Sequence, residues 1–323
     1  MCTALSFYGK HHYFGRNLDL ERKYDESVVI APRNYIIKYK SNMIERRHNA
    51  IIGMATVFDG YPLYYDATNE YGLSMAGLNF VGNASYNNEK YDMINLAPYE
   101  LILYILSNFS SVDEVLDNIK SLNVIDKTFN DILPNSQLHW LISDKNKSIT
   151  LETMKNGINI FENHLGVLTN NPPFEFHLMN LNNYLNISNS NHSDNFACGV
   201  KLQQYSKGMG GIGLPGDNSS MSRFVRATFN KFNSVVPKNN IDCVTQFFHI
   251  LGSVAQVEGS VMTNGKCDRT QYMSCCDMDD CVYYYKSYNN SQINAIKLFS
   301  ENLDSENLIC YKMIDSQKIN YLN

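Results

Sequence analysis

The chain opens with Met1-Cys2-Thr3-Ala4-Leu5-Ser6-Phe7, which puts a thiol on its second residue. A small residue after an initiator methionine is the usual circumstance in which that methionine is removed. Removal would leave a thiol and a free α-amine on Cys2, so this residue could be both nucleophile and base. A nucleophile paired with an adjacent amine is a recurring catalytic arrangement. Cys2 is therefore the first candidate catalytic residue.

The residues that follow predict a strand returning alongside Cys2. Gly9-Lys10 separates the opening run from the β-favouring stretch 11–19, and a two-residue Gly-x loop between such runs is typical of a hairpin. The hairpin would carry Arg16 and Asp19 towards the N-terminus. A cationic neighbour lowers the pKa of a thiol and enlarges its reactive fraction.

Length and charge exclude several classes of protein. The 323 residues suffice for one large domain or two ordinary ones, and the net charge is -5. The 27 Lys and Arg residues are spread along the chain, which argues against nucleic-acid binding. No apolar run approaches the roughly 18 residues that span a bilayer, and the N-terminus lacks the features of a secretory signal. We therefore expect a cytoplasmic protein that does not enter a membrane.

Two cofactor-like patterns lack the spacing that such sites require. The eight cysteines include a group at Cys267, Cys275, Cys276 and Cys281, but this group lacks the paired C-x2-C knuckles of structural zinc sites. The glycine-rich stretch 208–216 lacks the G-x-x-x-x-G-K-[ST] pattern of a phosphate-binding loop. Neither zinc nor nucleotide binding is predicted.

The periodicity of apolar residues changes several times along the chain. Short strands dominate the first third, including a hairpin predicted about Pro32-Arg33-Asn34. Helices are predicted from Pro98, from the capping box Ser111 to Glu114, from Pro172, and over 220–235 and 241–257. Strands cover 138–169 and return over 270–313. This order predicts two stacked sheets between two helical layers in one domain.

Six motifs, in order along the chain, resemble those of one enzyme family. They are Cys2-Thr3, Phe14-Gly15-Arg16-Asn17-Leu18-Asp19, Ala76-Gly77-Leu78-Asn79-Phe80, Gly166-Val167-Leu168-Thr169-Asn170, Gly213-Leu214-Pro215-Gly216-Asp217 and Ser222-Arg223-Phe224. From Cys2 to the last predicted strand, the chain resembles the choloylglycine hydrolase family, which comprises bile salt hydrolases and penicillin V acylases. It is most like a bile salt hydrolase.

The resemblance implies an α+β fold, the four-layer αββα fold of N-terminal-nucleophile hydrolases. A single domain would span residues 2–323 after removal of Met1. The implied catalytic residues are Cys2, Arg16, Asp19, Asn79, Asn170 and Arg223. Arg16 would activate the thiol, and Asp19 would orient the amine. Asn79 would stabilise the oxyanion, and loss of one such donor costs about 2.7–4 kcal/mol. Asn170 would bond the amine or the substrate.

The implied substrates are bile salts conjugated to glycine or taurine. Asparagine at position 79 is the bile-salt-hydrolase form, since the penicillin V acylases of this family tend to carry tyrosine there. The residues that match the pocket of the family are Leu18, Phe58, Tyr65, Phe129 and Leu133. Tyr65 is bulkier than the small residue that some bile salt hydrolases carry nearby, which leaves the conjugate preference and the pocket shape open. Penicillin V or N-acyl-homoserine-lactone acylase is the alternative within the same fold.

The implied chemistry needs no cofactor and no metal, and the only expected partners are the small-molecule substrate and further copies of the chain, as a tetramer. None of the eight histidines falls in a matched motif. A Cys-His dyad is the mechanistic alternative, although His139 and His249 have the surroundings of structural residues. A relative that binds bile salts without hydrolysing them is the alternative from another functional class.

Overall fold

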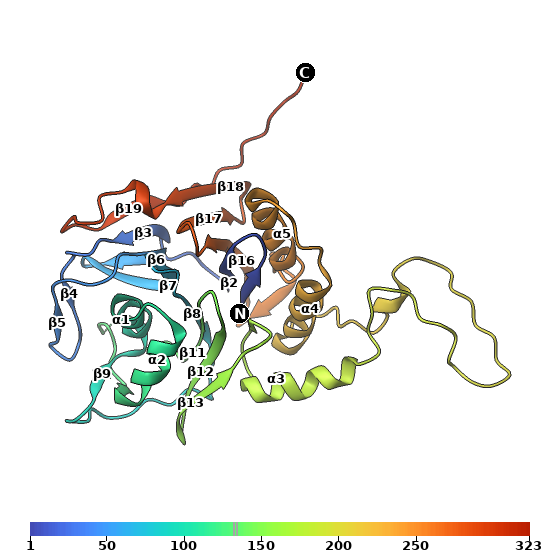
Figure 1. Ribbon diagram of the computed structural model, residues 1–323, viewed down its shortest axis with the longest axis horizontal. Helices are drawn as coiled ribbons and strands as arrows, with labels where there is room; N and C mark the ends of the chain where they lie inside the picture. Colours follow the sequence, from blue (N-terminus) through green and yellow to red (C-terminus); the bar gives the residue numbers. More distant parts are fainter. Residues whose placement is uncertain (132, 134) are drawn as a thin grey trace.

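Two large antiparallel sheets lie face to face in the computed structural model, which describes residues 1–131, 133 and 135–323 (Figure 1). The first sheet begins with the N-terminal strand and its hairpin partner. In spatial order its strands are β14 (Val167–Leu168), β1 (Cys2–Tyr8), β2 (His12–Leu20), β16 (Lys266–Asp277), β17 (Val282–Ser287) and β18 (Asn290–Lys297), with β15 (Val261–Thr263) paired to β16.

The second sheet has eight strands. In spatial order they are β13 (Gly157–Glu162), β12 (Ser148–Met154), β11 (Leu138–Ser143), β8 (Ser74–Asn79), β7 (Tyr61–Asn69), β6 (Ile51–Phe58), β3 (Ser27–Ala31) and β19 (Ile309–Lys312). Two small pairs stand apart from it, β4 (Ile37–Lys38) with β5 (Ile44–Glu45) and β9 (Ile94–Leu96) with β10 (Leu122–Val124).

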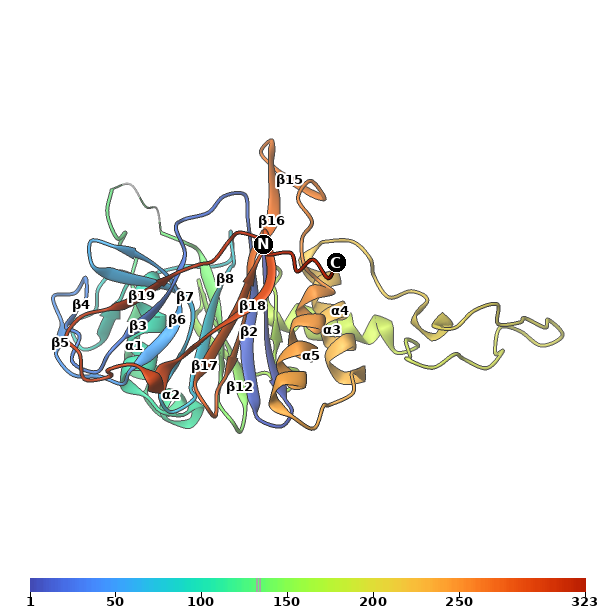
Figure 2. The ribbon, with the colours of Figure 1, turned by 90° about the horizontal axis from the view of Figure 1, so that it is seen from above.

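Helices cover the outer face of each sheet (Figures 1 and 2). On the eight-stranded side lie α1 (Leu101–Asn108), which contacts β7 and β8, and α2 (Val112–Asn118). On the other side lie α3 (Phe174–Leu181), α4 (Ser220–Asn233) and α5 (Asn240–Gly252). Helix α4 contacts β1, and α5 contacts β16 and β2. The predicted αββα order of layers is confirmed.

The eight-stranded sheet lies between two apolar cores, and successive side chains of its strands point alternately into one and the other. Val28 and Ile30 of β3 belong to a core shared with the seven-stranded sheet, whereas Val29 and Ala31 belong to a core shared with α1. Successive side chains of a strand point to opposite faces. The sheet therefore buries both of its faces, and Val28 to Ala31 of β3 accordingly form a continuous apolar run.

The helix starts follow the predicted chemistry. The Ser111 hydroxyl accepts a hydrogen bond from the Glu114 backbone N–H (3.2 Å) at the start of α2. Ser219 and Asn239 cap α4 and α5 in the same way. Satisfying the free N–H groups of a first turn in this manner is typically worth about 1 kcal/mol per helix.

Three predictions about the chain path are wrong. The hairpin about Pro32 does not form, because β3 already has a partner on each edge, β6 on one side and β19 on the other. Helix α5 ends at Gly252 and not at Val257, since the chain turns there to bond Thr270 through the backbone of Gln256. The loop between β1 and β2 has three residues, 9–11.

A buried carboxylate joins the two sheets. Asp66 of β7 accepts hydrogen bonds from the hydroxyls of Tyr272 (2.5 Å) and Ser274 (2.8 Å) on β16, and from Tyr283 (2.7 Å) on β17. Burial raises the pKa of Asp66, while Arg16 and the three hydroxyls oppose that rise. The Ser274 hydroxyl also accepts from the Arg16 backbone N–H. The contact therefore couples the packing of the sheets to the position of Arg16.

No helix in residues 1–131, 133 and 135–323 is long and apolar enough to cross a bilayer.

Replacing Tyr283 by Phe should lower the free energy of unfolding by about 1–3 kcal/mol, because it leaves a buried carboxylate short of a donor. Tyr285→Phe is the matched control on the same strand. The Tyr285 hydroxyl accepts one hydrogen bond, from the backbone N–H of Ile314, which is itself half-exposed. Tyr285→Phe should therefore lower the free energy of unfolding by less than Tyr283→Phe. Urea unfolding measures both. Equal losses in the two variants would contradict the special role of Asp66.

Lys231 of α4 gives a prediction about pH. Its ammonium is buried and donates to the Leu165 carbonyl (2.5 Å), and burial lowers the pKa of Lys231 to about 7. The unfolded chain, with the ordinary lysine pKa of about 10.4, then binds more protons than the folded chain between those values. Lys231 therefore lowers the free energy of unfolding by its largest amount below pH 7, where it is charged in both states. This destabilisation decreases as the pH rises from 7 towards 10.

The difference in unfolding free energy between Lys231→Met and the wild type should accordingly fall steadily from pH 7 to pH 10. Denaturant unfolding across this range measures it. Lys238→Met, at an exposed lysine, serves as the control and should show no such slope. A difference that is constant with pH would contradict the lowered pKa.

Candidate active site

Cys2 lies at the start of β1, buried between β2 and the loop that follows β14. It pairs with Leu18 across the hairpin. Its backbone N–H donates to the Oδ1 atom of Asn170 (2.7 Å). The predicted hairpin is confirmed, since it sets Ala4 opposite Arg16 and brings the motif 14–19 alongside the first strand.

Met1 prolongs the pairing of β1 by one residue. Its ammonium group donates to the Asp19 carbonyl (2.6 Å), and the Asp19 N–H donates to the Met1 carbonyl (2.9 Å). The same ammonium lies 3.9 Å from a carboxylate oxygen of Asp268. The nitrogen of Cys2 is an amide in this chain, and removal of Met1 would turn it into an amine already facing Asn170.

Arg223 of α4 ties the start of the chain to this asparagine. Its guanidinium donates to the Cys2 carbonyl, to the Thr3 hydroxyl (2.7 Å) and to Asn170 Oδ1 (2.8 Å). Burial lowers the pKa of Arg223, and the Asp19 carboxylate opposes that shift. The guanidinium therefore holds the backbone of Cys2 and the side chain of Asn170 together.

Asp19 lies beside the N-terminus, and one of its two carboxylate oxygens has a hydrogen-bond partner. The Thr270 hydroxyl donates to its Oδ1 (2.6 Å), while its buried Oδ2 has no hydrogen-bond partner among the described residues. Burial raises the pKa of Asp19, and the charges of Arg223 and the N-terminal ammonium counter that rise. The bare oxygen is a ready acceptor for a cationic or donor group.

Arg16 reaches from β2 to the eight-stranded sheet. Its Nη1 donates to the carbonyls of Gly77 (2.5 Å) and Tyr65 (2.9 Å), and its Nη2 is buried without a partner among the described residues. Burial alone would lower the pKa of Arg16, but the neighbouring Cys2, Tyr272 and Asp66 raise it above its ordinary value. Arg16 is thus a cation next to the thiol with one unused donor.

Asn79 ends β8 and touches the same group. Its backbone carbonyl accepts from Asn170 Nδ2 (2.8 Å), and its side chain is partly exposed. Asn170 thereby contacts Cys2, Asn79 and Arg223 at once. The structure brings together all six residues expected to be catalytic.

The residues expected to bind substrate fall into two groups. Leu18 is opposite Cys2, and Tyr65 bonds Arg16 through its carbonyl and Thr56 through its hydroxyl (2.9 Å). Phe58 and Phe129 instead pack edge to face, with ring centroids 5.7 Å apart.

Phe129 also lines a hollow of about 400 Å³ together with Tyr61 and Tyr99, and Cys2 is not among its lining residues. Leu133 donates its N–H to Asn130 Oδ1 (2.8 Å). Among the contacts of the described residues, Leu18 and Tyr65 are connected to the catalytic group, and Phe58, Phe129 and Leu133 are not.

Two buried histidines support the site without facing the thiol. His139 contacts Glu152 (3.1 Å) through one ring nitrogen and the Thr169 carbonyl (3.0 Å) through the other. His177 bonds the Asn170 carbonyl (2.8 Å), and burial lowers the pKa of His177 to about 4. A neutral His177 must donate this bond through Nε2–H, which makes it a positioning residue for Asn170.

Sequence reasoning missed several members of this network. They include Asp66, Thr270, His177 and Thr3, together with Tyr272 and Tyr283. Asp66 carried a usable signal, because a carboxylate inside an otherwise apolar strand is seldom buried unless it is paired. The hydroxyl residues carried none, since they are ordinary strand formers.

Comparison with known proteins agrees with this geometry. Residues 2–311 match the choloylglycine hydrolase family of linear amide C–N hydrolases. The chain is 51% identical over 314 residues to a bile salt hydrolase/transferase of Lactiplantibacillus plantarum, covering 97% of each chain. It is 42% identical to a bile salt hydrolase/transferase of Clostridium perfringens, covering both chains in full.

Solved structures give the same result. A mutant of the conjugated bile acid hydrolase from Clostridium perfringens superposes with a TM-score of 0.93 at 40% identity, and the match covers both chains completely. A penicillin V acylase from Agrobacterium tumefaciens shares the fold, with a TM-score of 0.77 at 18% identity over 96% of this chain and 91% of its own. From its sequence, its fold and the residues gathered at Cys2, this chain belongs to the choloylglycine hydrolase family of linear amide C–N hydrolases.

Proposed function

We propose that this protein hydrolyses the amide bond of bile salts conjugated to glycine or taurine, releasing the free bile acid and the amino acid. The observation that carries the proposal is the contact of the Cys2 nitrogen with Asn170 in a buried, charge-balanced site. Support for the substrate class comes from relatives that are 51% and 42% identical over nearly the whole chain and are named as bile salt hydrolases/transferases.

Removal of Met1 is the first step of the proposed mechanism. It frees the α-amine of Cys2. An α-amino group has an ordinary pKa of about 7.7–8.0, so it can relay a proton near neutrality. The amine takes the thiol proton as the sulfur attacks the amide carbonyl carbon. The Asp19 oxygen left bare in the described structure is suited to orient the ammonium that results.

The tetrahedral intermediate carries its negative charge on the former carbonyl oxygen. Asn79 donates to that oxygen through its side-chain amide, and Arg16 supports the developing charge on sulfur. The C–N bond then breaks, and the departing nitrogen takes the proton held by the Cys2 amine. Water, deprotonated by the same amine, cleaves the thioester, which releases the bile acid and restores the thiol.

Asn170 and Arg223 have supporting roles in this proposal. Asn170 Oδ1 accepts from the Cys2 nitrogen, and Arg223 holds that oxygen and the Cys2 carbonyl in place. Leu18 supplies an apolar surface for the steroid beside the thiol. Tyr65, whose carbonyl accepts from Arg16, is proposed to line the same pocket. Phe58, Phe129 and Leu133 are proposed as more distant substrate contacts on the family resemblance alone. Asparagine at position 79 favours bile salts over penicillin V, the alternative substrate of the family.

The decisive measurement compares kcat/KM for glycocholate, taurocholate and penicillin V, on protein whose N-terminus has been verified by mass spectrometry. We expect the conjugated bile salts to be the better substrates. Cys2→Ala should lower kcat by at least about 10³-fold, since the nucleophile is lost. Cys310→Ala, at an exposed thiol, is the control and should retain activity. Wild-type rates in Cys2→Ala, or in chains that retain Met1, would overturn the mechanism.

We further propose that residues 2–323 form a single domain, that the protein is cytoplasmic, and that it assembles into a homotetramer. A core that unites residues of both sheets supports the single domain. Eight free cysteines support a reducing compartment.

Support for assembly comes from residues 185–216, here called the arm, which project from the body in both views (Figures 1 and 2). The arm exposes Leu185, Phe196, Tyr205 and Ile212. Exposed apolar groups of this kind mark interaction surfaces, and a second copy of the chain is the proposed partner.

Replacing Phe196 and Tyr205 together by Ser should therefore shift the protein from tetramer to a smaller species. Light scattering coupled to size-exclusion chromatography measures this shift. Phe232→Ser, at an exposed aromatic residue of α4 outside the arm, is the control. A wild-type mass in the arm variant would rule out this surface as the contact.

A further inference from the structure

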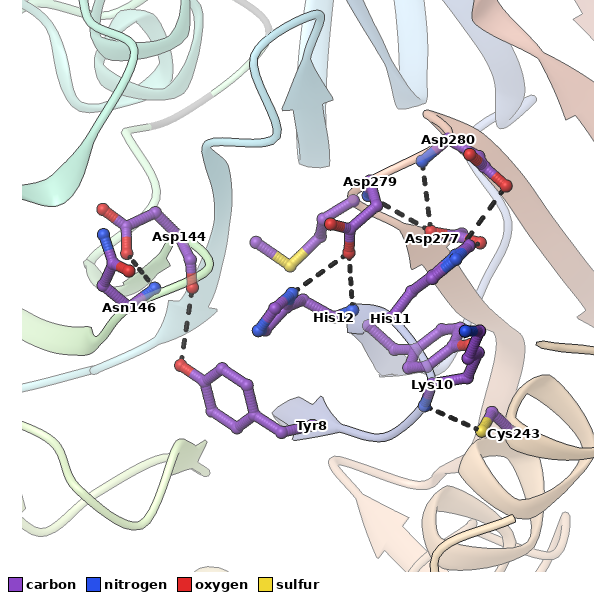
Figure 3. A network of polar contacts seen from close by, with 12 residues as sticks. Tyr8, Lys10, His11, His12, Asp144, Asn146, Cys243, Asp277, Asp279 and Asp280 are labelled. Atoms are coloured by element: carbon purple, nitrogen blue, oxygen red, sulfur yellow. Dashed lines mark hydrogen bonds and ion pairs between the residues drawn. The ribbon is translucent and has the colours of Figure 1, made fainter. Parts of the chain in front are cut away.

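A cluster of histidines and aspartates lies at the end of the β1–β2 hairpin remote from Cys2 (Figure 3). His11 and His12 come from that hairpin. Asp277 ends β16, and Asp279 and Asp280 lie in the turn between β16 and β17. The two turns are adjacent because β2 pairs with β16, with Phe14 opposite Cys276 and Tyr13 opposite Asp277. Since β1 has seven residues, roughly 20 Å separates this cluster from the thiol.

The donor atoms of the cluster are close enough to serve one ion. His11 Nδ1 lies 2.8 Å from Asp277 Oδ2, and ligand atoms of His11, Asp277 and Asp279 are all within 4.8 Å of one another. Ligands at about 2.0–2.2 Å from a tetrahedral zinc ion lie roughly 3.3–3.6 Å apart. An ion would replace the hydrogen bond between His11 Nδ1 and Asp277 Oδ2, so these two atoms would move apart while the Asp279 carboxylate moves in. Side-chain rotations allow both movements, because His11 is half-buried and Asp279 is exposed.

The buried ligand is held by partners of its own. Asp277 has no solvent exposure, its Oδ2 accepts from Asn240 Nδ2 (2.6 Å), and its Oδ1 accepts from the backbone N–H groups of Asp279 (3.1 Å) and Asp280 (3.2 Å). The Tyr13 hydroxyl in turn donates to Asn240 (3.0 Å). Outer partners of this kind orient the ligands of metal sites and strengthen binding.

Asp279 is likewise oriented before any ion binds. The His12 backbone N–H donates to its Oδ2 (2.7 Å), and His12 Nδ1 lies 3.0 Å from the same oxygen. Asp280 Oδ2 is 3.7 Å from His11 Nδ1. Three carboxylates thus converge on two imidazoles, an excess of negative charge that a divalent cation would neutralise. Imidazole ligands favour zinc and similar transition metals over magnesium or calcium.

From this geometry we propose that His11, Asp277 and Asp279 bind one divalent transition-metal ion, with His12 and Asp280 as neighbouring ligands. The site is distinct from the catalytic group. Bound there, the ion would join the turns of two hairpins of the seven-stranded sheet. Its effect would be to stabilise the folded chain in proportion to the logarithm of metal concentration.

The test is Zn²⁺ titration of the full chain by calorimetry and by thermal unfolding. We expect one site, and a rise in melting temperature with Zn²⁺ that EDTA reverses. His11→Asn preserves a donor towards Asp277 but removes the imidazole ligand, and Asp279→Asn removes a charge. Each should weaken the affinity by about 10-fold or more while leaving the melting temperature in EDTA close to that of the wild type.

His164→Asn is the matched control, because His164 and Glu162 form an exposed histidine–carboxylate pair elsewhere on the surface (3.5 Å). It should bind Zn²⁺ like the wild type. Anomalous diffraction from Zn²⁺-soaked crystals should place the ion at His11 Nδ1, which separates this site from binding by thiols. The proposal fails if the wild type shows no binding, if His11→Asn and Asp279→Asn bind as tightly as the wild type, or if the anomalous peak lies elsewhere.

Discussion

Burial of four charged side chains around the first strand is the constraint on which this structure depends. Arg16, Arg223, Asp19 and Asp66 are all nearly or fully inaccessible to water. An unpaired charge in such a place costs several kcal/mol, whereas balanced and hydrogen-bonded charges can be tolerated. The four come from β2, α4 and β7, so they balance only when both sheets and α4 have docked. Formation of the site and completion of the fold are therefore one event.

Predictions succeeded where the signal was local. The hairpin that brings Arg16 and Asp19 alongside Cys2 depends on a turn between two adjacent runs, and the helix start at Ser111 depends on four residues. The family motifs also located Asn79, Asn170 and Arg223, which no periodicity would have indicated. Their convergence on Cys2 is then visible in the contacts of Asn170.

Predictions failed where a distant segment decided the outcome. The partners of Asp66 lie more than 200 residues along the chain, and only the stacking of the sheets reveals them. The hairpin expected at Pro32 satisfied local turn chemistry, but β19, from the end of the chain, takes the free edge of β3. Helix α5 stops early for the same reason, because Thr270 captures the backbone of Gln256.

The pairing of Met1 with Asp19 has a practical consequence for anyone who prepares this protein. Both hydrogen bonds extend β1 by one residue, so a chain that keeps its methionine has the complete fold described above. Spectra, melting curves and elution profiles would hardly distinguish the two populations. Under the proposed mechanism only the trimmed chains turn over substrate. Specific activity would then report how completely the expression host's aminopeptidase had acted, and an active-site titration would be needed before batches are compared.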